Sequence, residues 1–199
     1  DRENTLDYLF PILRYHSRWS DLSAEDLTYM FGKDKISHNG YYMRVDARPA
    51  ENVPEGRPLA DYTIDAGQME WMEKIRLLCE ENGVRLVLIK APSLYPYWYE
   101  EWDRQICDYA DAHGLTYINL LALRDEIGLD YQTDTYDGGL HLNLAGAEKL
   151  SRYFGAALKD ACGLTDRRGE SRLAIAWEEK AQWYAKDRER QEEEIAAGK

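Results

Sequence analysis

The stretch from Asp134 to Ser151, DTYDGGLHLNLAGAEKLS, joins a histidine-bearing loop to the expected start of a helix. Two consecutive glycines allow the chain to bend sharply between Asp137 and His141, because glycine accepts positive φ. Asn143 follows, and its side chain can accept a free backbone N–H, which predicts a helix that begins directly after it. Beyond it, apolar and small residues recur at the spacing of one helix face: Leu144, Ala147, Leu150, Ser151, Phe154 and Leu158. The stretch therefore predicts a histidine in a tight loop beside a helix N-terminus.

Asp137 and His141 are four residues apart, and such a pair suits general acid–base chemistry. A carboxylate can fix the tautomer of an imidazole and stabilise the imidazolium that forms when the ring takes a proton. The residues alone leave a second interpretation open, in which the histidine is a surface or capping residue. A third would place Asp134, Asp137 and His141 around a divalent ion, since carboxylate and imidazole both ligate such ions. Three candidate ligands are too few for a complete metal site, so no metal is predicted.

Two segments upstream have the pattern of strands in a parallel sheet. VRLVLI, residues 84–89, is almost continuously apolar, as expected of a strand covered on both faces, and TYINL, residues 116–120, is a second short strand. A helix is predicted over 65–81, and further helical patterns follow each strand. This alternation predicts an α/β fold with a parallel sheet. The first strand leads to Ser93, and the carboxyl ends of such strands are where α/β proteins place their chemistry.

The run from Asp137 onward resembles the last motif block of the SGNH (GDSL-like) hydrolase superfamily. In the variety found in Gram-positive cell-surface acyl-transfer and esterase proteins, this block reads D-x-G-x-HLN-x-x-GA-x-K. The matching residues here are Asp137, Gly139, His141, Leu142, Asn143, Gly146, Ala147 and Lys149. The resemblance extends back to about Thr5, through LDYLFPILRYHSRW and RLVLIKAPS.

The resemblance implies a serine esterase or O-acyltransferase in which His141 is the general base and Asp137 orients it. Family members commonly space this pair as D-x-x-H, and position 138 is glycine here, so Asp134 is the second candidate for the acid. Asn143 is a further candidate site residue of the same block. The implied fold is a partial SGNH-like (flavodoxin-like) three-layer parallel sheet with covering helices, whose N-terminal strands are missing from this chain.

The resemblance also implies the substrate and the location of the complete protein. The substrate would be a small-molecule or glycan ester, and the protein would be extracytoplasmic, held to the membrane by an N-terminal anchor that precedes this chain. Residues 1–165 would form the C-terminal portion of the SGNH-like domain. Residues 166–199 are predicted to be a helical tail attached by its aromatic residues, Trp177, Trp183 and Tyr184.

A nucleophile is not evident in the chain, which contains no G-D-S, G-x-N-D or G-x-S-x-G sequence. We therefore expect the nucleophilic serine upstream of Asp1, with this C-terminal portion inactive alone. Ser93 is the alternative within the chain, because it follows a strand end. Pro92 precedes it, however, and no glycines shape the tight turn that exposes a nucleophile.

Residues 94–102, LYPYWYEEW, are dense in aromatic rings. Such rings can stack on sugars because they combine a large apolar area with a polar tip. Tyr95, Trp98 and Trp102 are therefore candidate substrate-binding residues, while packing in a core is the competing explanation. The same segment carries the alternative function, a catalytically silent glycan-binding or scaffold module.

Composition narrows the classes of partner. The 199 residues carry a net charge of −12, which disfavours nucleic acid, because binding phosphates needs a basic surface. No run is long and apolar enough to span a membrane. The three cysteines are far apart and form no C-x-x-C pair, so neither a zinc site nor another cofactor is predicted.

Overall fold

The structure is a computed structural model of the chain, and it describes residues 38–51, 53 and 55–198. The chain divides into two compact units, residues 1–42 and 43–199. In the first unit the described structure is a short 3-10 turn, η2 (His38–Gly40). The N-terminal part of the resemblance, LDYLFPILRYHSRW, lies outside the described residues.

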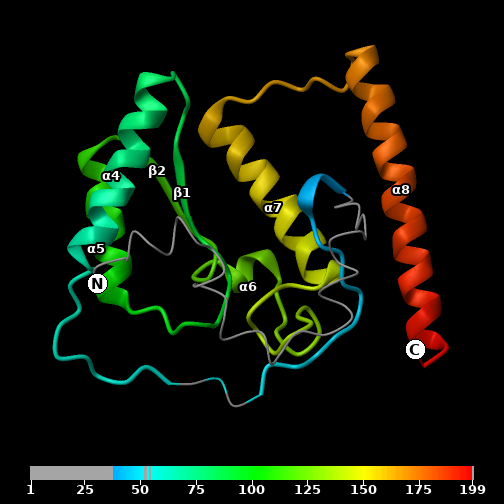
Figure 1. Cartoon of the computed structure of the whole chain (residues 1–199), viewed down its shortest axis with the longest axis horizontal. Coiled ribbons are helices and arrows are strands. Elements are labelled where there is room, and N and C mark those ends of the chain that lie inside the picture. The colour runs from blue at the N-terminus through cyan, green and yellow to red at the C-terminus, as the bar shows by residue number, and fades with distance from the viewer. Residues whose placement is uncertain (1–37, 52, 54, 199) are drawn as a thin grey trace, which may run out of the picture. The chain divides into compact units, whose positions relative to one another are not determined.

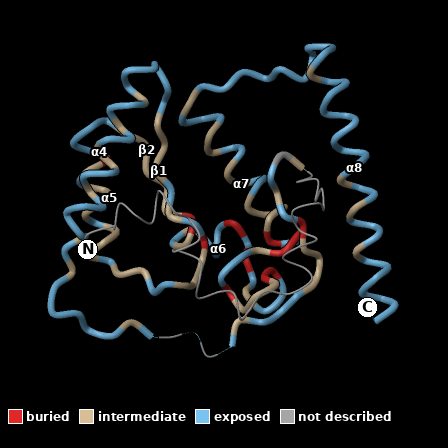
Figure 2. Tube along the Cα trace, in the orientation of Figure 1, coloured by how far each residue is buried: buried red, intermediate tan, exposed pale blue. Residues whose placement is uncertain are grey.

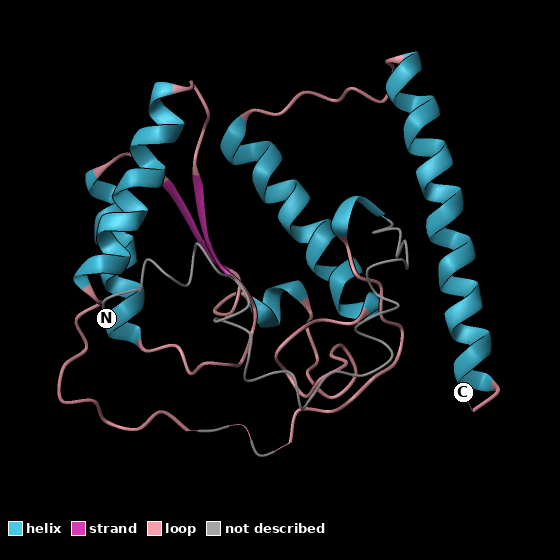
Figure 3. Ribbon diagram, viewed as in Figure 1, coloured by secondary structure: helices cyan, strands magenta, loops and turns pink. Residues whose placement is uncertain are grey.

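The described part of the second unit contains five α-helices and a two-stranded parallel sheet (Figure 1; Figure 3). In chain order the elements are α4 (Ala66–Glu81), β1 (Val87–Lys90), α5 (Glu100–Ala112), β2 (Thr116–Asn119), α6 (Arg124–Ile127), α7 (Leu144–Cys162) and α8 (Ser171–Ala196). The strands pair in register from Val87 opposite Thr116 to Lys90 opposite Asn119. The protein is therefore mixed α/β and mostly helical, which confirms the predicted class and the predicted parallel pairing.

Helices lie on both sides of the two strands, with α4 and α5 on one side and α7 on the other (Figure 1). The α4 and α5 helices are joined by the Tyr109 hydroxyl, which donates to Glu73 at 2.6 Å. Arg85, just before β1, donates to the carbonyl of Cys162 at the end of α7, at 2.7 Å. Ile89 of β1 is nevertheless 49% exposed. The described residues thus do not cover β1 as fully as its apolar sequence predicts.

The buried core lies where the two strands end. Its centre is Leu120, Ile127 and Leu129. Figure 2 shows the buried positions gathered around α6 and the start of α7. Two polar side chains, Thr135 and Asp134, are as fully buried as the best-packed leucine. The loop that precedes α7 is therefore part of the core, and the residues it carries are held on a packed base.

The last helix, α8, meets the rest of its unit through polar groups. Tyr184 donates to Glu148 at 3.2 Å, and Arg188 approaches the same carboxylate at 3.4 Å. Trp177 and Trp183 are 60% and 65% exposed. The predicted aromatic attachment is therefore wrong for the two tryptophans. Within the part of the chain that the structure describes, no helix combines the length and apolar character needed to cross a membrane.

A candidate acid–base site

Asp137 and His141 are joined through both side chain and backbone. Nδ1 of His141 lies 2.6 Å from Oδ2 of Asp137. The other carboxylate oxygen accepts the backbone N–H of His141 at 2.7 Å and that of Leu140 at 3.2 Å. An ionised carboxylate only accepts hydrogen bonds, so the neutral imidazole carries its proton on Nδ1 and keeps a lone pair on Nε2. The His141 side chain is 61% exposed, so solvent reaches the ring.

The carboxyl group of Asp137 is held in its ionised form. Partial burial by itself would raise its pKa, but the hydrogen bonds from the His141 ring, the His141 backbone and the Leu140 backbone outweigh burial. The net effect lowers the pKa of Asp137 below its ordinary value of 3.8. At neutral pH Asp137 is therefore a carboxylate that can stabilise an imidazolium at His141.

The loop between the pair is shaped by its two glycines and by a neighbouring segment. Gly138 and Gly139 have φ of 79° and 105°, conformations that disfavour other residues. The carbonyl of Gly139 accepts the N–H of Leu94 at 2.9 Å. A Cβ at Gly139 would lie 2.8 Å from Cδ1 of Leu94, a side-chain end that can move, so the φ of 105° is the stronger reason for glycine here. This contact ties the loop to the segment that follows β1, at the carboxyl end of the sheet.

Asn143 is the N-cap of α7, as predicted. Its Oδ1 accepts the N–H of Gly146 at 3.1 Å. Its Nδ2 donates to the carbonyls of Thr133 at 2.8 Å and Asp46 at 3.1 Å. Because the side chain is buried and its amide is occupied, the geometry gives Asn143 a structural role in the site.

Asp134, the second candidate for the acid, faces the core. Its Oδ2 lies 2.6 Å from Nζ of Lys149 on α7 and accepts the N–H of Asp130 at 2.8 Å. Asp134 is 2% exposed, and among the described residues it makes no hydrogen bond with His141. The geometry therefore favours Asp137 as the partner of His141. No group of three or more histidine, cysteine, aspartate or glutamate side chains in the described part of the chain is arranged to hold a metal ion.

Ser93 closes the turn after β1. Its hydroxyl donates to the carbonyl of Tyr95 at 2.6 Å and accepts the Tyr95 N–H at 3.2 Å. Within the described residues, Ser93 and His141 form no hydrogen bond with each other. The Ser93 hydroxyl is thus hydrogen-bonded within its own turn, and among the described residues no histidine or carboxylate side chain forms a hydrogen bond with it.

The three aromatic candidates lie in two different environments. Trp98 and Trp102 pack edge to face, with ring centroids 5.7 Å apart, and Nε1 of Trp98 donates to Asp103 at 3.1 Å. Tyr99 extends this cluster, 4.7 Å from Trp102. Tyr95 instead lines a pocket. Packing therefore accounts for the two tryptophans, and Tyr95 is the candidate placed to meet a ligand.

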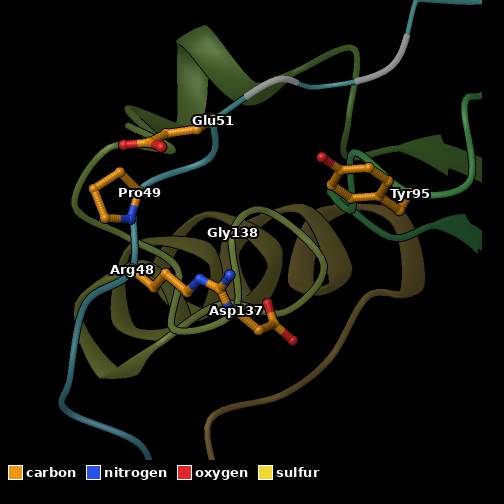
Figure 4. A pocket seen from close by; sticks show the side chains of 6 residues that line it. All are labelled: Arg48, Pro49, Glu51, Tyr95, Asp137 and Gly138. Carbon is orange, nitrogen blue, oxygen red and sulfur yellow. The ribbon is translucent and has the colours of Figure 1, made fainter.

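The pocket has a volume of about 320 Å³ and shares Asp137 with the acid–base pair. Figure 4 shows its lining, which comes from three segments: Arg48, Pro49 and Glu51 before α4, Tyr95 after β1, and Asp137 and Gly138 before α7. One guanidinium, two carboxylates and a phenol ring suit a polar ligand that both donates and accepts hydrogen bonds.

Sequence reasoning missed Arg48 and Tyr136. Arg48 reaches the pocket because its backbone pairs with Thr135, which donates its hydroxyl to the Arg48 carbonyl at 2.8 Å. Tyr136 stacks on His141, with ring centroids 5.8 Å apart. In the sequence, only the position of Tyr136 directly before Asp137 indicates that its ring could lie near the acid–base pair. Arg48 gives none, because about 90 residues separate it from the loop.

Comparison of the chain with known protein families, with characterised proteins and with solved structures finds no match. The chemical interpretation of the site therefore depends on its geometry and on the motif resemblance.

Proposed function

We propose that this chain is the C-terminal part of an SGNH-type serine esterase or O-acyltransferase, with His141 as general base and Asp137 as its orienting acid. The observation that carries the proposal is the 2.6 Å contact between Nδ1 of His141 and Oδ2 of Asp137. Two backbone N–H groups on Oδ1 fix that carboxylate, so the imidazole is presented in one tautomer.

The chemistry follows from that tautomer. Nε2 of His141 takes the proton of a serine hydroxyl while the serine oxygen attacks the acyl carbon of an ester. The imidazolium then returns the proton to the departing alkoxide, which leaves as an alcohol. Water or a second alcohol repeats the sequence on the acyl-serine and gives hydrolysis or transfer. Asp137 stays ionised throughout and stabilises the imidazolium.

The serine is proposed to lie in sequence upstream of Asp1. Support comes from the absence of a nucleophile motif in the chain and from Ser93, whose hydroxyl is bound within its own turn. We also propose that β1 and β2 belong to a larger three-layer SGNH-like sheet. Their parallel pairing and the 49% exposure of Ile89 support that proposal, because a strand in such a sheet is covered. An extracytoplasmic, membrane-anchored location goes with this proposal through the resemblance alone.

The pocket beside Asp137 is proposed to bind the part of the substrate next to the ester. Arg48 and Glu51 would bind its oxygen and hydroxyl groups, and the Tyr95 ring would pack on its apolar face. A small-molecule or glycan ester fits these three side chains.

The test is ester turnover by the full-length protein with the single substitution His141→Ala. A chromogenic short-chain acyl ester serves as substrate, and circular dichroism checks folding. Turnover should fall by about 10³-fold or more, because the reaction loses its general base. His113→Gln is the matched control, since His113 is the C-cap of α5 and lies 3.9 Å from Glu73. Unchanged turnover in a folded His141→Ala protein would overturn the proposal.

A further inference from the structure

The imidazole of His141 is held from a second direction that the pair with Asp137 does not use. The ring of Tyr136 stacks on it at an interplanar angle of 10°. A single hydrogen bond at Nδ1 leaves the imidazole plane free to tilt, and a tilt bends the bond to Asp137, which weakens the preference for a proton at Nδ1. A parallel aromatic neighbour opposes the tilt, because tilting the ring loses the stacked contact.

The backbone makes Tyr136 and His141 neighbours. Thr135 and Leu142 form an isolated antiparallel bridge. In that register the next pair toward the loop is Tyr136 with His141, and opposite residues of an antiparallel pair place their side chains together on one face. Because Thr135 is fully buried, the bridge that brings Tyr136 and His141 together is anchored in the packed core.

Arg44 holds Tyr136 in turn. The centre of its guanidinium lies 5.1 Å from the centroid of the Tyr136 ring. Nε and Nη2 of Arg44 each lie 2.7 Å from one oxygen of Asp46, a two-pronged contact that fixes the guanidinium plane. The Arg44 carbonyl accepts the N–H of Leu144 at 2.7 Å, which ties this segment to the first turn of α7.

We propose that Tyr136 is a positioning residue that holds the imidazole plane of His141, and that Arg44 keeps the Tyr136 ring in place. The effect of Tyr136 on turnover rests on the proposed function, whereas its effect on the orientation of the imidazole does not. With the plane held, Nε2 points at one place, where a reacting hydroxyl can meet it. Loss of the stack should therefore lower kcat and leave KM unchanged.

The experiment compares Tyr136→Leu with Tyr136→Phe in the full-length protein. Nitrogen-15 chemical shifts of the neutral His141 ring report the fraction of molecules protonated at Nδ1. We expect that fraction to stay at its wild-type value in Tyr136→Phe and to drop in Tyr136→Leu. The kcat for the chromogenic ester should fall about threefold to tenfold in Tyr136→Leu, the range that one aromatic contact supports, at constant KM.

A wild-type tautomer fraction in a folded Tyr136→Leu protein would overturn the proposal, and so would an equal drop in both variants. If the wild-type protein turns over no ester, the proposed function fails, while the tautomer fractions still decide the positioning role. If Tyr136→Leu does not fold, Arg44→Met decides instead, because it keeps the tyrosine and removes only the guanidinium that holds its ring. It should lower the Nδ1-protonated fraction by a smaller amount, and no change would refute the positioning role.

Discussion

Replacing Gly146 by alanine tests how closely α7 is seated on the loop that carries the site. Gly146 is buried in the first turn of α7. A Cβ built there would lie inside 3.0 Å of the Asp134 carbonyl oxygen and 3.1 Å from Cδ2 of Leu142. That carbonyl cannot turn away without loss, because it accepts the Asn143 N–H at 2.9 Å. Alanine therefore forces the helix and the loop apart.

The magnitude follows from two opposing effects. Alanine stabilises a helix relative to glycine by about 0.5–1 kcal/mol. Overpacking a fixed core costs about 1–3 kcal/mol, and a backbone contact belongs at the upper end of that range. We expect Gly146→Ala to lower the free energy of unfolding by about 2 kcal/mol net. Gly155→Ala is the matched control on the same helix, since nothing lies within 4 Å of its added Cβ. It should raise the free energy of unfolding by about 0.5–1 kcal/mol.

Urea unfolding followed by circular dichroism measures both variants against the wild-type protein. Opposite signs with an unchanged denaturant slope are the expected result. If Gly146→Ala is as stable as wild type, the close approach of α7 to the Asp134 backbone is refuted, and with it the packed base of the site.

Three further predictions concern the two carboxylates of the loop and the aromatic residues after β1. Asp134→Asn should lower the free energy of unfolding by about 2–3 kcal/mol, because it removes the charge paired with Lys149. Asp137→Asn should lower it by less than about 1 kcal/mol but reduce kcat by about 10³-fold. The reverse pattern in urea unfolding and ester assays would exchange the roles of the two carboxylates. The pKa of Asp137 is lowered from 3.8, so its carboxylate contributes stability above pH 3.8 and loses that contribution as the pH falls through the lowered pKa. A carbon-13 NMR titration of Asp137 should have its midpoint below pH 3.8. A midpoint above pH 3.8 would contradict the hydrogen bonds described for this carboxylate. Tyr95→Leu should raise KM about threefold to tenfold with stability unchanged. Trp102→Leu should lower the free energy of unfolding by about 1–3 kcal/mol with KM unchanged. A KM that changes only in Trp102→Leu would indicate that the tryptophan cluster, and not Tyr95, contacts the substrate.

Elements whose ends depend on one side chain could be predicted from the sequence. Asn143 caps α7 as predicted, and the helix predicted over 65–81 begins directly after Asp65, which accepts the N–H groups of Gly67 and Gln68 at 2.9 and 3.2 Å. The parallel pairing of the two apolar segments followed from the helix between them. Each of these depends on residues close together in the chain, which is why spacing was enough.

The motif resemblance placed Asp137 ahead of Asp134 as the partner of His141, but the sequence could not show what Asp134 does instead, because that depends on a distant partner. Asp134 and Asp137 are three residues apart and of the same type. Lys149 on α7 and the surrounding core make Asp134 a buried ion-pair member, whereas Asp137 stays at the surface beside His141. Likewise, the exposure of Trp177 depends on how α8 packs, which its own charge pattern does not state.

Serine labelling of the full-length protein would show whether His141 activates a serine upstream of this chain. A fluorophosphonate probe reacts with a serine that a histidine base activates, and mass spectrometry locates the modified residue. We expect one labelled serine upstream of Asp1, with labelling lost in His141→Ala and kept in His113→Gln. Labelling at Ser93, labelling that persists without His141, or no labelling of the folded wild-type protein would contradict it.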